Sequence, residues 1–211
     1  MSTPYVPFGL AIHLLDDIPA LFNSPDTTII KKPFVGKTFM CVLPGGQLYF
    51  ESKLSADSDG STYARQDPDG QAETSTRDDK GKSLDADLVN YFVLPGSFFL
   101  EQGIRKGDIA VVIFGVWKAF ACFGDVGPKG HLGEGSISLL RELGKETIIG
   151  RNTVGGGRFT NNGIDRGVIT IVFPGSGNGL GQRNRASEAI GAPLFEKLKR
   201  QAADYTQLPD I

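Results

Sequence analysis

Short apolar runs, rich in β-branched and aromatic residues and separated by glycine and proline, most constrain this fold. "VGKTFMCVLPGGQLYFESKL" (35–54) contains two such runs around a Pro-Gly-Gly turn, which predicts a hairpin. "DIAVVIFGVWKAFACFGD" (108–125) contains two more, which meet near Gly115 and predict a second hairpin. Further strands are expected up to Pro95 and over 167–175.

Two segments have helical rather than strand periodicity. "GSISLLRELG" (135–144) has an apolar stripe with Gly144 as its stop, and "APLFEKLKRQAADY" (192–205) is amphipathic with Pro193 suited to a first helical turn. Strands and helices do not alternate, so a doubly wound parallel sheet is not favoured. The sequence predicts a strand-dominated single domain over residues 1–211, with two or three helices.

Composition excludes several classes of protein. The net charge of −2 and a pI near 5.7 offer no basic surface for nucleic acid. No apolar segment approaches the length of a membrane span, and the N-terminus lacks the basic segment and small-residue cleavage site of a secretion signal. The glycine-rich "GSGNGLG" (175–181) follows a strand but lacks the lysine of a phosphate-binding loop.

Only two cysteines, Cys41 and Cys122, are present. They allow one disulfide or two buried thiols, and their apolar surroundings favour the thiols. With two histidines in the whole chain, a zinc site built from His and Cys is not expected.

Residues 55–83 have almost no large apolar side chains and many Asp, Ser, Thr and Gly. Such a composition is typical of a disordered linker or of a long surface loop. Apolar runs on both sides favour the loop. Its Asp57-Ser58-Asp59-Gly60 segment suits a turn, and it lacks the further ligands of a calcium loop.

Two isolated carboxylates stand on either side of a glycine-rich stretch in "CFGDVGPKGHLGEGS" (122–136). A strand that ends at Gly124-Asp125 would place Asp125 at its C-terminal end, and Glu134 would lie just before a helix or in its first turn. Hydrolysis of a glycosidic bond uses two such carboxylates. Aspartate after glycine and glutamate before a helix are also common structural choices, so both interpretations stay open at this point.

"GDVGPKGHLGEGS" followed by "ISLLRELG" resembles the chitosanases of glycoside hydrolase family 75, in which Gly-Asp-x-Gly precedes a short turn, Gly-Glu-x-Ser and an apolar helix. Four more segments agree in order, and the resemblance covers roughly 47–175. They are "KLSADSDGS" (53–61), "DPDGQAETS" (67–75), "NYFVLP" (90–95) and "VITIVFPG" (168–175).

The resemblance implies a mainly β (α+β) fold, with a six-stranded barrel of the double-psi kind and a few peripheral helices. The family-like core would cover about 36–175, with 1–35 and 176–211 as peripheral extensions. The family's catalytic acids correspond to Asp125 and Glu134, which we assign as general base and general acid of an inverting mechanism. A helix N-terminus favours the charged form of a carboxylate, which argues against Glu134 as acid if it lies on the helix axis.

Seven side chains are candidates for substrate binding: Asp57, Asp59, Gln71, Thr74, Lys53, Trp117 and His131. The two aspartates would attract glucosamine ammonium groups, Gln71 and Thr74 would bond sugar hydroxyls, and Trp117 would stack on a sugar ring. Six of them have a structural alternative. The aspartates suit a turn, Gln71 and Thr74 suit a capped turn, and Lys53 and His131 suit solvated surface positions.

The implied activity is endo-hydrolysis of β-1,4 linkages between glucosamine units of chitosan, by a secreted monomer that needs no metal or organic cofactor. One alternative is a peptidoglycan hydrolase or lytic transglycosylase on the same barrel. Another is a carbohydrate-binding module without catalysis, against which the presence of both acids counts.

Overall fold

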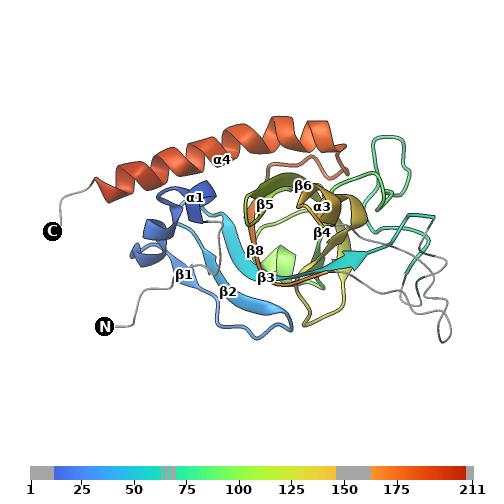
Figure 1. Cartoon of the computed structure of the whole chain (residues 1–211), viewed down its shortest axis with the longest axis horizontal. Coiled ribbons are helices and arrows are strands. Elements are labelled where there is room, and N and C mark those ends of the chain that lie inside the picture. Colours follow the sequence, from blue (N-terminus) through green and yellow to red (C-terminus); the bar gives the residue numbers. More distant parts are fainter. Residues whose placement is uncertain (1–11, 63, 65–66, 68–69, 146–162, 208–211) are drawn as a thin grey trace.

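The computed structural model of the chain describes residues 12–62, 64, 67, 70–145 and 163–207, and strands dominate this part of the chain (Figure 1). The strands are β1 (Thr28–Ile29), β2 (Lys37–Val42), β3 (Leu48–Asp57), β4 (Tyr91–Pro95), β5 (Ile109–Phe114), β6 (Trp117–Gly127), β7 (Glu134–Ser136) and β8 (Ile164–Phe173). The helices are α1 (Ile12–Leu15), the 3-10 helix η1 (Ile18–Asn23), α2 (Phe98–Glu101), α3 (Ile137–Glu142) and α4 (Asn184–Thr206).

Six of these strands close into a barrel. The hydrogen-bonded order is β1-β2-β3-β7-β4-β6-β5-β8, and a further pairing of β3 with β8 joins the ends of the last six. β3–β7 and β4–β6 are parallel pairs, whereas the other pairs of the barrel are antiparallel. The predicted fold class, a mainly β protein with a six-stranded barrel and a few peripheral helices, is confirmed.

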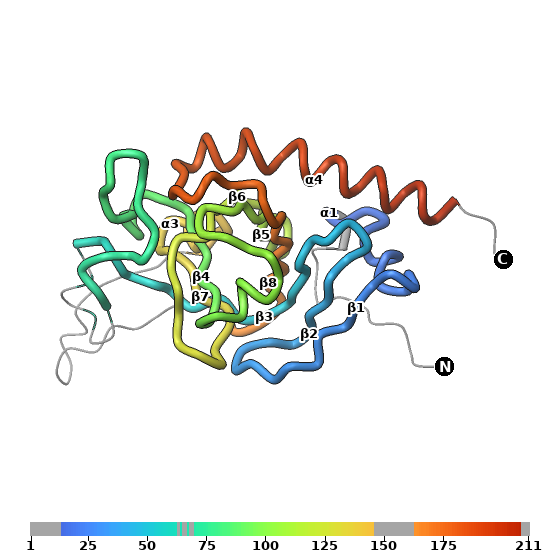
Figure 2. The backbone as a smooth tube through the Cα atoms, turned by 180° about the vertical axis from the view of Figure 1, so that it is seen from behind, coloured from blue at the N-terminus to red at the C-terminus, as the bar shows by residue number. Residues whose placement is uncertain are grey.

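Alternate residues of the barrel strands contribute to two separate apolar clusters. In β4, Phe92 and Leu94 belong to the cluster inside the barrel, whereas Tyr91 and Val93 belong to the cluster on its outer face. The outer cluster includes Phe195 of α4, which runs across β5 and β6 in both views (Figures 1 and 2). The barrel therefore buries apolar side chains on both faces where α4 covers it.

Both predicted hairpins form. A turn with Gly46 at φ 83° joins β2 to β3, and Gly115 at φ 58° with Val116 joins β5 to β6. The predicted helix α3 also forms, and its start is fixed because the Ser136 side chain accepts a hydrogen bond from the Leu139 N–H.

The C-terminal helix differs from its prediction. It begins at Asn184, so Pro193 lies inside α4 rather than in its first turn. The additional turns pack closely on the barrel, since any side chain at Gly191 would overlap the Phe120 ring. Tertiary packing therefore outweighs the local signal of the proline.

Asp108, just before β5, fixes the glycine-rich segment after β8. Its fully buried carboxylate accepts hydrogen bonds from the N–H groups of Arg105 (2.8 Å), Gly175 (3.0 Å) and Gly177 (2.8 Å). These bonds end β8 at Phe173, two residues earlier than predicted. "GSGNGLG" thus binds a carboxylate of its own chain through the kind of backbone donors that bind anions elsewhere.

Cys41 and Cys122 are both free and buried, which confirms the thiols rather than the disulfide. Burial raises the pKa of Cys41 to about 12 and that of Cys122 to about 11. Both thiols therefore stay protonated and chemically inert at physiological pH.

We expect Asp108→Ala to lower the free energy of unfolding by about 3 kcal/mol, because three backbone donors lose a buried acceptor. Asp78→Ala is the matched control. Asp78 also accepts two backbone N–H groups, from Lys80 (2.9 Å) and Lys82 (2.8 Å), but at an exposed turn where water can replace it. Its loss should be much smaller than that of Asp108→Ala. Urea denaturation measures both, and equal losses would contradict the buried clamp.

Candidate active site

An open pocket of about 390 Å³ lies at the end of β3 and is lined by five carboxylates. They are Asp57, Asp59, Asp67, Asp125 and Glu134. No lysine, arginine or histidine occurs among the described residues that line it. This acidic pocket therefore has a negative potential, which attracts cationic groups.

β4 lies between the two strands that carry Asp125 and Glu134. Its residue Val93 pairs with Asp125 of β6 on one side and with Glu134 of β7 on the other. Paired residues of neighbouring strands project from the same face of a sheet, so both acids stand on the outer face beside Val93. Their backbones are two strand spacings apart, which is about 10 Å.

A bulge in β6 directs Asp125 to this outer face. The register between β4 and β6 shifts after Phe123, so that Gly124 is an extra residue and Asp125 pairs with Val93. Strict alternation would direct Asp125 to the side of Phe123, which lies inside the barrel. The extra residue reverses this direction. Asp125 thus lies near the C-terminal end of its strand, as predicted, although the strand continues two residues further, to Gly127.

The absence of a side chain at Gly124 makes room for Tyr91. A Cβ atom at Gly124 would overlap the Cβ atom and ring of Tyr91. Tyr91 is fully buried, and its hydroxyl donates a hydrogen bond to the backbone carbonyl of Asp59 (3.2 Å). Burial and neighbouring carboxylates, Asp57 first among them, raise the pKa of Tyr91 well above its ordinary value. Tyr91 therefore remains a donor that supports the segment carrying Asp57 and Asp59.

Backbone N–H groups of the 58–90 loop bind two of the acids. Asp125 Oδ1 accepts hydrogen bonds from the Ser75 N–H (2.9 Å) and the Val126 N–H (2.7 Å). Asp59 Oδ1 accepts one from the Gln71 N–H (2.6 Å). The loop is thus attached to the barrel through the carboxylates of the pocket, as expected for a surface loop of the same domain.

The pocket holds two carboxyl groups with raised pKa values. Burial, followed by the charge of Asp59, raises the pKa of Asp57 from 3.8 to about 8, although the Asp59 N–H donates to this carboxylate (2.8 Å). Burial also raises the pKa of Asp59 to about 6. The charge of Asp125 and a carboxyl hydrogen bond to it add to this rise, and the Gln71 N–H opposes it. Both groups are therefore protonated under mildly acidic conditions.

A second pocket of about 470 Å³ adjoins the acidic pocket and shares Gln71, Asp125 and Val126 with it. Its lining includes Glu73 and Arg77, which form an exposed ion pair (2.6 Å). Asp125 thus lies where two hollows meet. Such an arrangement suits a ligand that extends to both sides of Asp125.

The structure places the predicted substrate-binding residues in different surroundings. Asp57 and Asp59 line the acidic pocket, and the exposed Gln71 lines both pockets. Thr74 lines the second pocket but is buried, and its hydroxyl donates to the Thr76 carbonyl (2.9 Å). The Thr74 hydroxyl therefore organises the loop.

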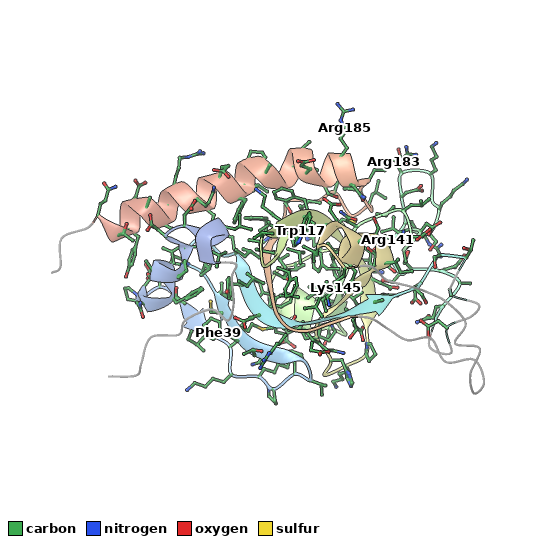
Figure 3. All side chains as sticks on the ribbon, viewed as in Figure 1. Phe39, Trp117, Arg141, Lys145, Arg183 and Arg185 are labelled. Atoms are coloured by element: carbon green, nitrogen blue, oxygen red, sulfur yellow. The ribbon has the colours of Figure 1, made fainter. Side chains whose placement is uncertain are left out.

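Lys53, His131 and Trp117 line neither pocket. The Lys53 ammonium donates to the Ser55 hydroxyl (2.8 Å), and His131 is exposed in the turn before β7. Trp117 is 52% exposed but begins β6 at the end opposite Asp125, and Figure 3 shows it near α3. The structure therefore does not bring these three side chains together with the acids.

Sequence analysis did not identify Tyr91, Gly124 or Asp67 as parts of the site. An isolated glycine inside a strand pattern is a signal for a bulge. Gly124 is such a glycine, because the apolar Val126 two residues later is consistent with a strand that continues beyond it. The period of two in "NYFVLP" groups Tyr91 with Val93, but it does not show which acids that face meets.

One oxygen from each of Asp57, Asp59 and Asp125 lies within 4.8 Å of the others. Among the described residues, these three carboxylates form the group that is close enough to share a cation. Three oxygens are fewer than the six to eight that calcium takes. Backbone N–H groups already bind all three carboxylates, so we assign no metal to them.

A profile of the family described as fungal chitosanase of glycosyl hydrolase group 75 matches residues 54–206. The chain belongs to this family. The match includes all five acids of the acidic pocket, and it confirms the resemblance noted in the sequence. Membership makes the protein a glycoside hydrolase of the chitosanase type. A search of curated proteins found no match.

No helix in the described part of this group 75 protein combines the length and apolar character of a membrane span.

The raised pKa of Asp57 predicts a pH-dependent cost to the fold. The folded state keeps this proton up to about pH 8, whereas the unfolded chain releases it near 3.8, so the free energy of unfolding should fall as pH rises between these values. Asp57→Asn removes the effect, and we expect it to be more stable than wild type by about 1–3 kcal/mol at pH 9 but not at pH 4.

Urea denaturation at several pH values measures this difference. Asp165→Asn, which changes an exposed aspartate of β8, is the control and should track wild type throughout. A difference between Asp57→Asn and wild type that stays constant with pH would show that Asp57 does not keep its proton in the folded state.

Proposed function

We propose that this protein hydrolyses internal β-1,4 linkages between glucosamine units of chitosan. The observation that carries the proposal is the pair Asp125 and Glu134, which flank Val93 on one face of the barrel and line one open pocket. Glycoside hydrolysis requires a carboxylic acid that protonates the leaving oxygen and a second carboxylate that assists attack. This pair supplies both groups.

Asp125 is the general base and Glu134 the general acid in this mechanism. Two N–H donors at Asp125 Oδ1 stabilise negative charge, as a base requires. Glu134 is the first residue of β7 and precedes the helix cap Ser136, so it lies outside α3 and the helix objection no longer applies. A Cβ atom at Gly127 would lie 2.9 Å from Glu134 Oε2, so the glycine leaves space for this carboxyl group.

The spacing of the pair supports an inverting reaction. Inverting glycosidases keep their carboxyl groups about 6.5–9.5 Å apart, which leaves room for a water molecule, and the backbone spacing of about 10 Å is compatible with this range. Asp125 takes a proton from the water as it attacks the anomeric carbon. Glu134 gives its proton to the glycosidic oxygen as that bond breaks.

The charge of the pocket supports a cationic polysaccharide as substrate. The ionised members of these five carboxyl groups attract glucosamine ammonium groups, and no lysine, arginine or histidine among the described lining residues opposes them. The adjoining second pocket supports binding on both sides of the cleaved bond and hence endo-cleavage, with Gln71 within reach of either side. Since a polymer of this kind is met outside the cell, we propose that the protein acts as a secreted monomer.

Asp125→Asn and Glu134→Gln should each lower kcat on chitosan at least about a hundredfold, because each removes one acid–base group. Glu101→Gln is the matched control, since Glu101 is 53% exposed and pairs with Lys32 on the surface. Reducing-end release measures the rates, and circular dichroism checks the fold. Near-normal rates in both pocket variants would refute the catalytic pair.

The same assay on chitin and peptidoglycan tests the alternatives. Faster release from peptidoglycan than from chitosan would favour the peptidoglycan-acting enzyme. Tight binding to a polymer without turnover would favour a binding module.

The stereochemistry can be read separately. We expect the first product detected by proton NMR to have the α configuration, because single displacement at a β linkage inverts the anomeric carbon. An initial β product would instead indicate a covalent intermediate and a closer carboxyl pair.

A further inference from the structure

Asp59 and Asp125 form a close pair of carboxyl groups in the acidic pocket. Only 7% of Asp59 and 6% of Asp125 is exposed, and one oxygen of each lies within 4.8 Å of the other. Two buried carboxylates at this distance cannot both be charged at low cost, so the pair retains one proton between them.

The hydrogen bonds around the pair locate this proton. Asp125 Oδ1 accepts two backbone N–H groups, from Ser75 and Val126, whereas Asp59 Oδ1 accepts one, from Gln71. More donors stabilise more negative charge, so Asp125 is the ionised member and Asp59 holds the proton. The direction of the pKa shift of Asp59 agrees with this order.

None of the described residues that face Asp59 or line the acidic pocket carries a positive charge. The titratable groups that face Asp59 are Asp57 at the end of β3, Asp67 of the loop, Asp125 of β6 and the Tyr91 hydroxyl of β4. The remaining acid of the pocket is Glu134 on β7. Those of these carboxyl groups that are ionised add negative charge, which favours the protonated form of Asp59.

We propose that Asp59 is a positioning residue, which in its protonated form donates a hydrogen bond to Asp125 and orients that carboxylate toward the attacking water. This inference rests on the proposed function, in which Asp125 is the base. When Asp59 loses its proton, the donor disappears and two like charges face each other. Asp125 then turns away from the water, and kcat falls on the alkaline side. The role differs from the ammonium contact expected from the sequence.

Replacement of the donor tests the proposal. Asp59→Asn keeps an N–H donor toward Asp125 that does not titrate, so its kcat at pH 5 should stay within about threefold of wild type. The alkaline fall of its kcat should move up by at least about one pH unit. Asp59→Ala removes the donor and should lower kcat about 10–100-fold at pH 5, where wild-type Asp59 holds its proton, with KM within about twofold. The difference from wild type should shrink as pH rises and wild-type Asp59 loses its own proton. Asp165→Asn, which changes an exposed residue of β8 that lines neither pocket, should keep the wild-type profile.

All variants are assayed on the same chitosan, so titration of the substrate affects them equally. An alkaline fall that does not move in Asp59→Asn would overturn the proposal, whatever the activity of Asp59→Ala. A raised KM with normal kcat in both variants would also overturn it and would assign Asp59 to the ammonium contact. If instead Asp125→Asn keeps full activity, the proposed function itself fails, and that result is independent of the Asp59 profiles.

Discussion

The site depends on one local constraint, the extra residue that Gly124 adds to β6. Alternation along a strand would place Asp125 inside the barrel, where a carboxylate among phenylalanine side chains would be strongly disfavoured. The bulge turns Asp125 outward, and the missing side chain lets Tyr91 pack beneath it. Because Tyr91 also bonds the Asp59 carbonyl, the same glycine positions both members of the carboxyl pair.

The acids have a structural role as well as a chemical one. Asp125 and Asp59 accept N–H groups of Ser75 and Gln71, so the loop that completes the pocket is held by the carboxylates it surrounds. Asp57, by contrast, is placed where burial and like charge oppose its ionisation. Such a concentration of acids is unfavourable for stability and is typical of a functional site, where the fold tolerates local cost.

Local signals predicted much of the fold. Turn glycines at 46 and 115 and the Ser136 helix cap act within a few residues, so the sequence shows them directly. The start of α4 was missed because it depends on the contact of Gly191 with Phe120, two residues far apart in the chain. Closure of the barrel through β3 and β8 is equally non-local, and only the family resemblance supplied it.

The candidate site was predictable to a similar extent. Asp125 and Glu134 were identified through a motif, but the register that places Val93 between them depends on strands that are not consecutive in the chain. The search for aromatic residues that could stack on a sugar selected Trp117. This residue begins β6, whereas Asp125 lies near the other end of the same strand. Conversely, the pairing of Asp59 with Asp125 leaves no local pattern, since the two belong to different segments.

β7 has only three residues, yet it bridges β3 and β4 and so completes the ring of strands. Its first residue is Glu134. The element that seals the barrel is therefore also the element that carries the proposed proton donor. If Glu134 has that role, maturation of the fold and onset of catalytic competence coincide in a single short segment.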